Sequence, residues 1–290
     1  MRFFADLGTN PLLVAGFLGG ILASVGCGVI GPYVFVRRIA FLAGAVAHAA
    51  VAGIGAVIYL RHGFPDGLAW LEPVHGALAV ALLAAVLMGV VQHVARERLD
   101  TLIGALWSIG MATGILLARI TPGYQIDLMS YLFGNIAIVA RSDVVLIAVL
   151  DVVVIATLAL THKRLMATAI DAEHTRLQGV GVLATNLVLL ALVALTVVAL
   201  IRVVGLILVI ALLTLPAAAA GQFARRMGSL IGLSVVLSLI VVTVPRIAVY
   251  GTRVSPESAI VLSAGALYLA ALLLRRRSRR RRPVGVGGRG

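Results

Sequence analysis

The most constraining feature of this chain is a series of long apolar runs, separated by short gaps that hold most of the charged residues. One run, residues 41–60, reads FLAGAVAHAAVAGIGAVIYL; it has no Asp, Glu, Lys or Arg, and its one histidine is His48. About 20 apolar residues cross ~30 Å of hydrocarbon, where a helix satisfies its own backbone polar groups. With 61% apolar and 12% charged residues, the composition excludes a soluble domain and predicts an all-α, polytopic transmembrane helical bundle.

The apolar runs predict about nine spans, with eight and ten as the limits. The predicted spans are residues 11–31, 39–60, 74–95, 101–120, 143–162, 181–201, 203–223, 227–250 and 257–274. With the N-terminus outside, seventeen of the 24 Lys and Arg residues fall on the cytoplasmic side, as the positive-inside rule requires. We therefore predict an outside N-terminus and a cytoplasmic C-terminus. The first residues show no cleavage pattern, so no removed signal peptide is expected.

Residues 1–274 are predicted to form one membrane domain, and residues 275–290 a basic, disordered cytoplasmic tail. The tail adds eight positive charges to a formal net charge of +13 and no negative ones. Basic residues directly after a last span hold topology and contact anionic lipid, so membrane lipid is the expected partner and nucleic acid is not. Cys27 is the only cysteine, which excludes an intramolecular disulfide.

Few polar residues lie inside the predicted spans. The clear cases are His48, Asp151, Asn186 and Thr214, the last beside Pro216. Ionisable groups within a membrane mark transport paths, although a neutral, hydrogen-bonded core histidine would explain His48 as well. Asn186 and Thr214 are expected to form hydrogen bonds between helices. Pro216 removes a backbone hydrogen bond and is predicted to kink or break the seventh span.

Four stretches identify a family resemblance that covers nearly the whole chain. They are GPYVFVRRIAFLAGAVAHAAVAGIG (31–55), QIDLMSYLFGNIAIV (125–139), MATAIDAEHTRLQGVGV (166–182) and RVVGLILVIALLTLPAAAAGQFARR (202–226). In order and spacing they resemble the membrane permease subunits of bacterial zinc and manganese ABC importers. The resemblance implies a fold like that of type II ABC importers and a homodimer in the bacterial inner membrane. It also implies an ABC ATPase subunit, an extracytoplasmic metal-binding protein, and a transported zinc, manganese or iron ion with no permanently bound cofactor.

The sequence itself also indicates that ATP hydrolysis and transport belong to separate subunits. The chain has no Gly-x-x-x-x-Gly-Lys-Ser/Thr loop, and its only lysine is Lys163, so a separate subunit must hydrolyse ATP. The resemblance assigns residues 163–180, with Asp171, Glu173 and Gly179, to a coupling loop on the ATPase; the plain alternative is a solvated connector. Thr175 departs from the family's usual alanine.

The resemblance also gives His48 a role. The second span of these permeases typically carries Gly-Asp-x-x-x-His-Ala, in which the Asp and His can contact a passing cation. Here the histidine is kept, but Gly44 stands where the carboxylate is expected. A single imidazole cannot hold or select an ion by itself, so we predict another acid, first Asp151 and second Asp127, or a weakly coordinated ion. Gly134 and Pro216 are predicted to lie at the helix breaks that form a gate.

Two other classes of membrane protein fit the sequence less well. A secondary cation transporter, needing no ATPase, is disfavoured by the coupling-type loop and by the scarcity of intramembrane acids. An intramembrane enzyme is disfavoured because no Ser-Gly nucleophile turn, HExxH motif or paired aspartates appear. His62, Asp66, Glu72 and His75 are expected to belong to a hydrated outer loop.

Overall fold

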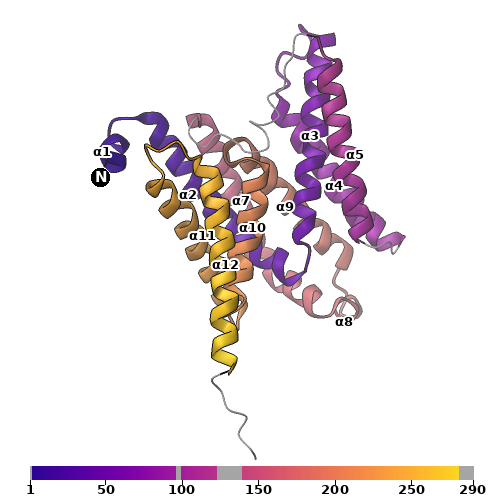
Figure 1. Cartoon of the computed structure of the whole chain (residues 1–290). Helices are drawn as coiled ribbons and strands as arrows, with labels where there is room; N and C mark the ends of the chain where they lie inside the picture. Colours follow the sequence, from indigo (N-terminus) through magenta and orange to yellow (C-terminus); the bar gives the residue numbers. More distant parts are fainter. Residues whose placement is uncertain (1, 96–98, 123–138, 281–290) are drawn as a thin grey trace, which may run out of the picture.

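The computed structural model describes residues 2–95, 99–122 and 139–280, which form helices and short connections without a strand (Figure 1). This confirms the predicted all-α bundle. The helices are α1 (Arg2–Leu7), α2 (Pro11–Val36), α3 (Ala40–Gly63), α4 (Pro73–Val94), α5 (Leu99–Ile120), α7 (Arg141–Ile170), α8 (Ala172–Leu177), α9 (Val182–Val204), α10 (Leu206–Ala220), α11 (Met227–Ala248) and α12 (Pro256–Arg280).

Each of the nine predicted spans is a helix, and eight of these helices are long and apolar enough to cross a membrane. The predicted span 203–223 is the shorter α10, whose 15 residues extend about 22 Å. The predicted span 143–162 lies within the longer α7. Helix α12 continues through Arg280, so the predicted tail begins inside a helix. Residues 123–138, which include Asp127 and Gly134, lie outside the described residues.

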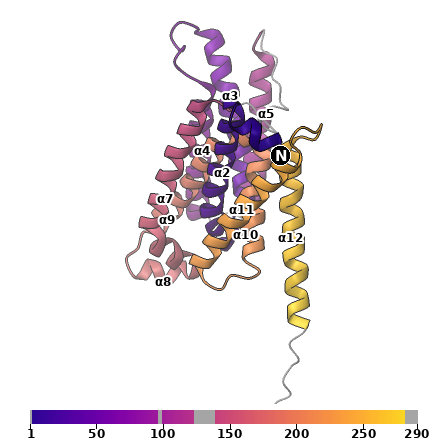
Figure 2. The ribbon, with the colours of Figure 1, turned by 90° about the vertical axis from the view of Figure 1, so that its left-hand side faces the viewer.

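The helices alternate in direction between two ends of the bundle (Figures 1 and 2). Helix α2 packs on α7, α10 and α11, whereas α3 packs mainly on α4 and α5 and contacts α9 and α10. The short helix α8 lies at the same end as the C-terminal end of α12, which we call the α8 end. Helix α1 and the connection between α3 and α4 lie at the opposite end.

Helix α5 packs on α3 through glycines at a small-xxx-small spacing. A Cβ placed on Gly110 would lie 2.6 Å from the Cα of Ala49, and one on Gly114 would lie 2.5 Å from the carbonyl oxygen of Val51. The two backbones therefore approach too closely for any side chain. In a membrane, such close packing replaces the missing hydrophobic force between helices.

We expect Gly110→Ala to lower the free energy of unfolding by about 1–3 kcal/mol, because the new methyl group meets backbone that cannot move aside. Gly104 is the matched control, since it lies on the same helix with open space around it. There, Gly104→Ala should be neutral or stabilising by about 0.5–1 kcal/mol. Thermal unfolding in detergent measures both. Equal midpoints for the two variants would contradict the tight α3–α5 contact.

The interruption near the seventh predicted span falls at Gly205 and not at Pro216. Gly205 has φ 77°, a left-handed conformation that favours glycine, and it separates α9 from α10. Helix α10 runs through Pro216 without a break, and the proline ring is buried. Beside it, a Cβ on Gly31 would lie 2.6 Å from the carbonyl oxygen of Leu213, so α2 packs closely against this turn.

Candidate functional site

His48 lies in the middle of α3, where only 6% of its surface is exposed. Its Nδ1 is 2.8 Å from the carbonyl oxygen of Gly44, one turn earlier on the same helix. Its ring stacks on the indole of Trp107 from α5, with the centroids 4.2 Å apart and the planes at 25°. If Nδ1 donates to Gly44, the lone pair on Nε2 is available to accept a proton or a metal ion.

Trp107 also occupies the space beside Gly44. A Cβ placed on Gly44 would lie 2.9 Å from Cζ3 of Trp107 and 3.4 Å from Cδ1 of Ile210. The ring therefore fills the position where the carboxylate expected from the resemblance would begin. No pattern in the sequence pointed to Trp107, because an aromatic residue within a span is typical of ordinary packing.

Asp151 lies on α7 and faces a different helix. Its carboxylate packs directly on the Cα of Gly26 in α2, which leaves room for it by having no side chain. The residue is 7% exposed, and its Oδ2 has no hydrogen-bond partner among the described residues. Since the contacts of His48 lie on α3 and α5, the structure does not bring His48 and Asp151 together within one chain.

Within the described ranges, no three His, Cys, Asp or Glu residues are grouped so that they could hold a metal ion. Two of the residues assigned to the predicted outer loop lie at the start of a helix: Glu72 is the N-cap of α4, and its backbone N–H donates to Nδ1 of His75 in the first turn at 3.0 Å. In the part of the chain that the structure describes, His48 is thus an imidazole on a helix face and does not belong to a closed metal centre.

The segment between α7 and α9 forms the short helix α8 at one end of the bundle. Asp171 caps it, with Oδ1 accepting from the backbone N–H of His174 at 2.9 Å. Thr175 is buried and donates to the carbonyl of Asp171, whereas Glu173 is exposed. Gly179 ends the turn with φ 80°. The helix is thus ordered and not an irregular connector.

Exposed apolar side chains lie at both ends of α8. Ile170 precedes it and is 85% exposed, while Leu177 ends it and is 83% exposed. Phe223, which follows the end of α10, is half exposed. Exposed apolar residues next to charged ones are typical of a surface that contacts another protein.

Arg37 connects the helices at the α8 end, a role that the sequence did not indicate. Its Nη1 donates to the carbonyl of Thr168 in α7 at 2.7 Å, and its Nη2 donates to Oδ1 of Asn186 in α9 at 2.5 Å. One turn earlier, the hydroxyl oxygen of Tyr33 lies 2.7 Å from Nδ1 of His162 in α7. Burial lowers the pKa of Arg37, but a guanidinium stays protonated.

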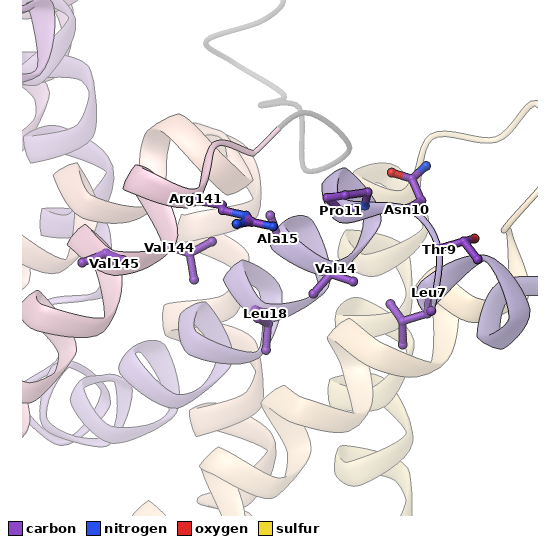
Figure 3. Close-up of a pocket in the computed structure, with 11 residues that line it drawn as sticks. Leu7, Thr9, Asn10, Pro11, Val14, Ala15, Leu18, Arg141, Val144 and Val145 are labelled. Carbon is purple, nitrogen blue, oxygen red and sulfur yellow. The ribbon is translucent and has the colours of Figure 1, made fainter.

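A cavity of about 470 Å³ lies at the opposite end, between the start of α2 and the start of α7 (Figure 3). Arg141 reaches across it toward Ala15, and Val14, Leu18 and Val144 form an apolar wall. None of its described lining residues is a carboxylate, imidazole or thiol. These described residues therefore offer none of the ligands that transition metals prefer.

The chain matches the ABC 3 transport family over residues 9–275, and it belongs to this family. It is 38% identical over 259 residues to an uncharacterized membrane protein of Synechocystis, covering 89% of each chain. It is 32% identical over 266 residues to a probable metal transport system membrane protein of Chlamydia trachomatis, covering 92% of this chain and 90% of that one. The solved structure of PsaBC from Streptococcus pneumoniae in complex with Fab superposes with a TM-score of 0.82 at 25% identity, covering 97% of this chain and 99% of that one. Family membership confirms the predicted class, a transport permease and not an enzyme.

Proposed function

We propose that this chain is the permease subunit of an ABC importer that moves a divalent transition metal ion, zinc, manganese or iron, into the cytoplasm. The observation that carries this proposal is the family match over residues 9–275. The name of the relative from Chlamydia trachomatis supports a metal substrate. An imidazole in the middle of a spanning helix supports it chemically, since imidazole suits zinc and several neighbouring metals.

In this proposal His48 lines the path and contacts the ion through Nε2. Trp107 covers one face of the imidazole. The weak coordination expected from one imidazole per chain suits transport, in which release matters as much as entry. A homodimer would bring two copies of His48 to one path. Asp151 and Asp127 remain candidates for an additional ligand, although Asp151 faces α2.

The proposed partners follow from the two ends of the bundle. An ABC ATPase would dock on α8, where Asp171, Glu173 and exposed apolar side chains form an ordered surface. A metal-binding protein would deliver the ion at the opposite end. This requires the α8 end to be cytoplasmic and the N-terminus to be outside, in agreement with the Lys and Arg bias.

Uptake by the reconstituted complex tests the proposed substrate. Proteoliposomes containing the permease, its ATPase and the binding protein would receive radiolabelled zinc, manganese or iron(II) in separate experiments. We expect ATP-dependent uptake of at least one of them and inhibition by an excess of the same unlabelled ion. Uptake of none of the three would contradict the proposed metal substrate.

Reversing both charges of α8, in Asp171→Lys with Glu173→Lys, should uncouple ATP hydrolysis from uptake while leaving membrane insertion intact. The reversal changes the surface that meets the ATPase and also removes the helix cap, worth about 1 kcal/mol. Asp171→Asn with Glu173→Gln is the matched control, since asparagine caps as well as aspartate. We expect that control to retain more uptake per ATP hydrolysed. Unchanged uptake in the charge-reversed variant would count against docking at α8.

A further inference from the structure

Arg37 lies at a rigid turn between the helix that packs centrally and the helix that carries His48. Helix α2 ends at Val36, and α3 begins at Ala40. Between them Arg38 has φ 57°, its N–H donates to the carbonyl of Phe35 at 3.1 Å, and the N–H of Ile39 donates to the carbonyl of Val34 at 3.1 Å. This pair of bonds is a Schellman motif, which fixes the direction of the chain after a helix.

The two acceptors of Arg37 lie on either side of α8. Thr168 is in the last turn of α7, directly before α8, and its carbonyl is one of those that a helix end leaves without a partner inside the helix. Asn186 is in the second turn of α9, directly after α8. A planar guanidinium with several N–H groups in fixed directions can hold both acceptors at once, which an ammonium cannot do as well. Arg37 thus joins both neighbours of α8 to the α2–α3 turn.

We propose that Arg37 is a positioning residue that transmits movement of α8 to α3 and so to the transport path. When the ends of α7 and α9 move with α8, the two hydrogen bonds pull the α2–α3 turn, and the Schellman motif passes that displacement to α3. The inference rests on the proposed function, because it assumes that α8 is moved by an ATPase.

The first test is the ratio of metal ions taken up to ATP hydrolysed, measured on the full complex in proteoliposomes. We expect Arg37→Gln to lower this ratio about tenfold while ATP hydrolysis continues. Arg37→Lys should give an intermediate ratio, because it keeps the charge but loses the paired donors. Arg38→Gln is the matched control, because Arg38 is exposed and its replacement removes the same charge from the same turn. It should leave the ratio unchanged.

The acceptor on α9 gives a second pair of variants. Asn186→Asp keeps an oxygen for Arg37 and should keep the ratio, whereas Asn186→Leu should lower it as Arg37→Gln does. A purely structural role would instead lower uptake and ATP hydrolysis in proportion, together with the amount of folded complex. An unchanged ratio in both Arg37→Gln and Asn186→Leu would overturn the proposal.

A spectroscopic measurement tests this role of Arg37 independently of the proposed metal substrate. Single spin labels would be attached at Leu177→Cys in α8 or at Phe41→Cys in the first turn of α3, both of which are exposed. The native Cys27 is buried. We expect nucleotide to change the mobility of both labels in the otherwise unchanged permease, and only of the α8 label when Arg37→Gln is added. A response at both sites in that variant would overturn transmission through Arg37, whichever ion the complex carries.

Discussion

Replacing His48 by phenylalanine should lower metal uptake by about 10–100-fold while the folded permease keeps its stability. Phenylalanine keeps an aromatic ring to stack on Trp107, but it removes both nitrogen atoms and therefore the imidazole ligand in the middle of α3. Uptake per folded complex and the thermal unfolding midpoint, measured on one preparation, give both quantities.

His48→Ala is the companion variant, because it removes the ligand and the packing together. The imidazole is buried and stacked on Trp107, so its loss should leave a cavity and destabilise the fold by about 2–4 kcal/mol. A path-lining role predicts low uptake in both variants and low stability only in His48→Ala. Normal uptake by His48→Phe would show instead that His48 is a core histidine and that the path lies elsewhere.

Restoring the carboxylate at position 44 should tighten metal binding about tenfold or more, provided that Trp107 is removed as well. Gly44→Asp places an acid one helical turn from His48, and the two side chains can then share one ion. With Trp107 present, the new side chain would meet its ring, so Gly44→Asp alone should destabilise the fold by about 1–3 kcal/mol.

The matched comparison is Gly44→Asp with Trp107→Ala against Trp107→Ala alone. Both lack the indole, so they differ only in the carboxylate. Calorimetric titration with zinc and with manganese, on protein in detergent, measures the affinities. Equal affinities for both ions in the two variants would mean that residues 44 and 48 do not face a common ion.

The spans could be predicted from the sequence because the thickness of the hydrocarbon sets the length of every apolar run. The interruption between α9 and α10 could not, because Pro216 gives a strong signal for a break, whereas Gly205 is one of 31 glycines. Its left-handed conformation is visible only in the structure.

The neighbours of the candidate site residues were less predictable still. His48 could be selected because a histidine in a span is rare, but its contact with Trp107 depends on how α3 and α5 cross. Arg37 looked like one more basic residue at a cytoplasmic helix end, where Lys and Arg are expected in any case. Its contacts with Thr168 in α7 and Asn186 in α9 are with residues 131 and 149 positions further along the chain.

The central claim, that this permease carries a metal ion inward with energy from a separate ATPase, is tested most directly by accumulation in proteoliposomes. The complete complex would be supplied with ATP, with a non-hydrolysable ATP analogue or with no nucleotide, and the internal and external concentrations of labelled metal would be compared. We predict that only ATP raises the internal free concentration above the external one. Accumulation by the permease alone, without ATPase or nucleotide, would contradict the account and indicate a secondary transporter.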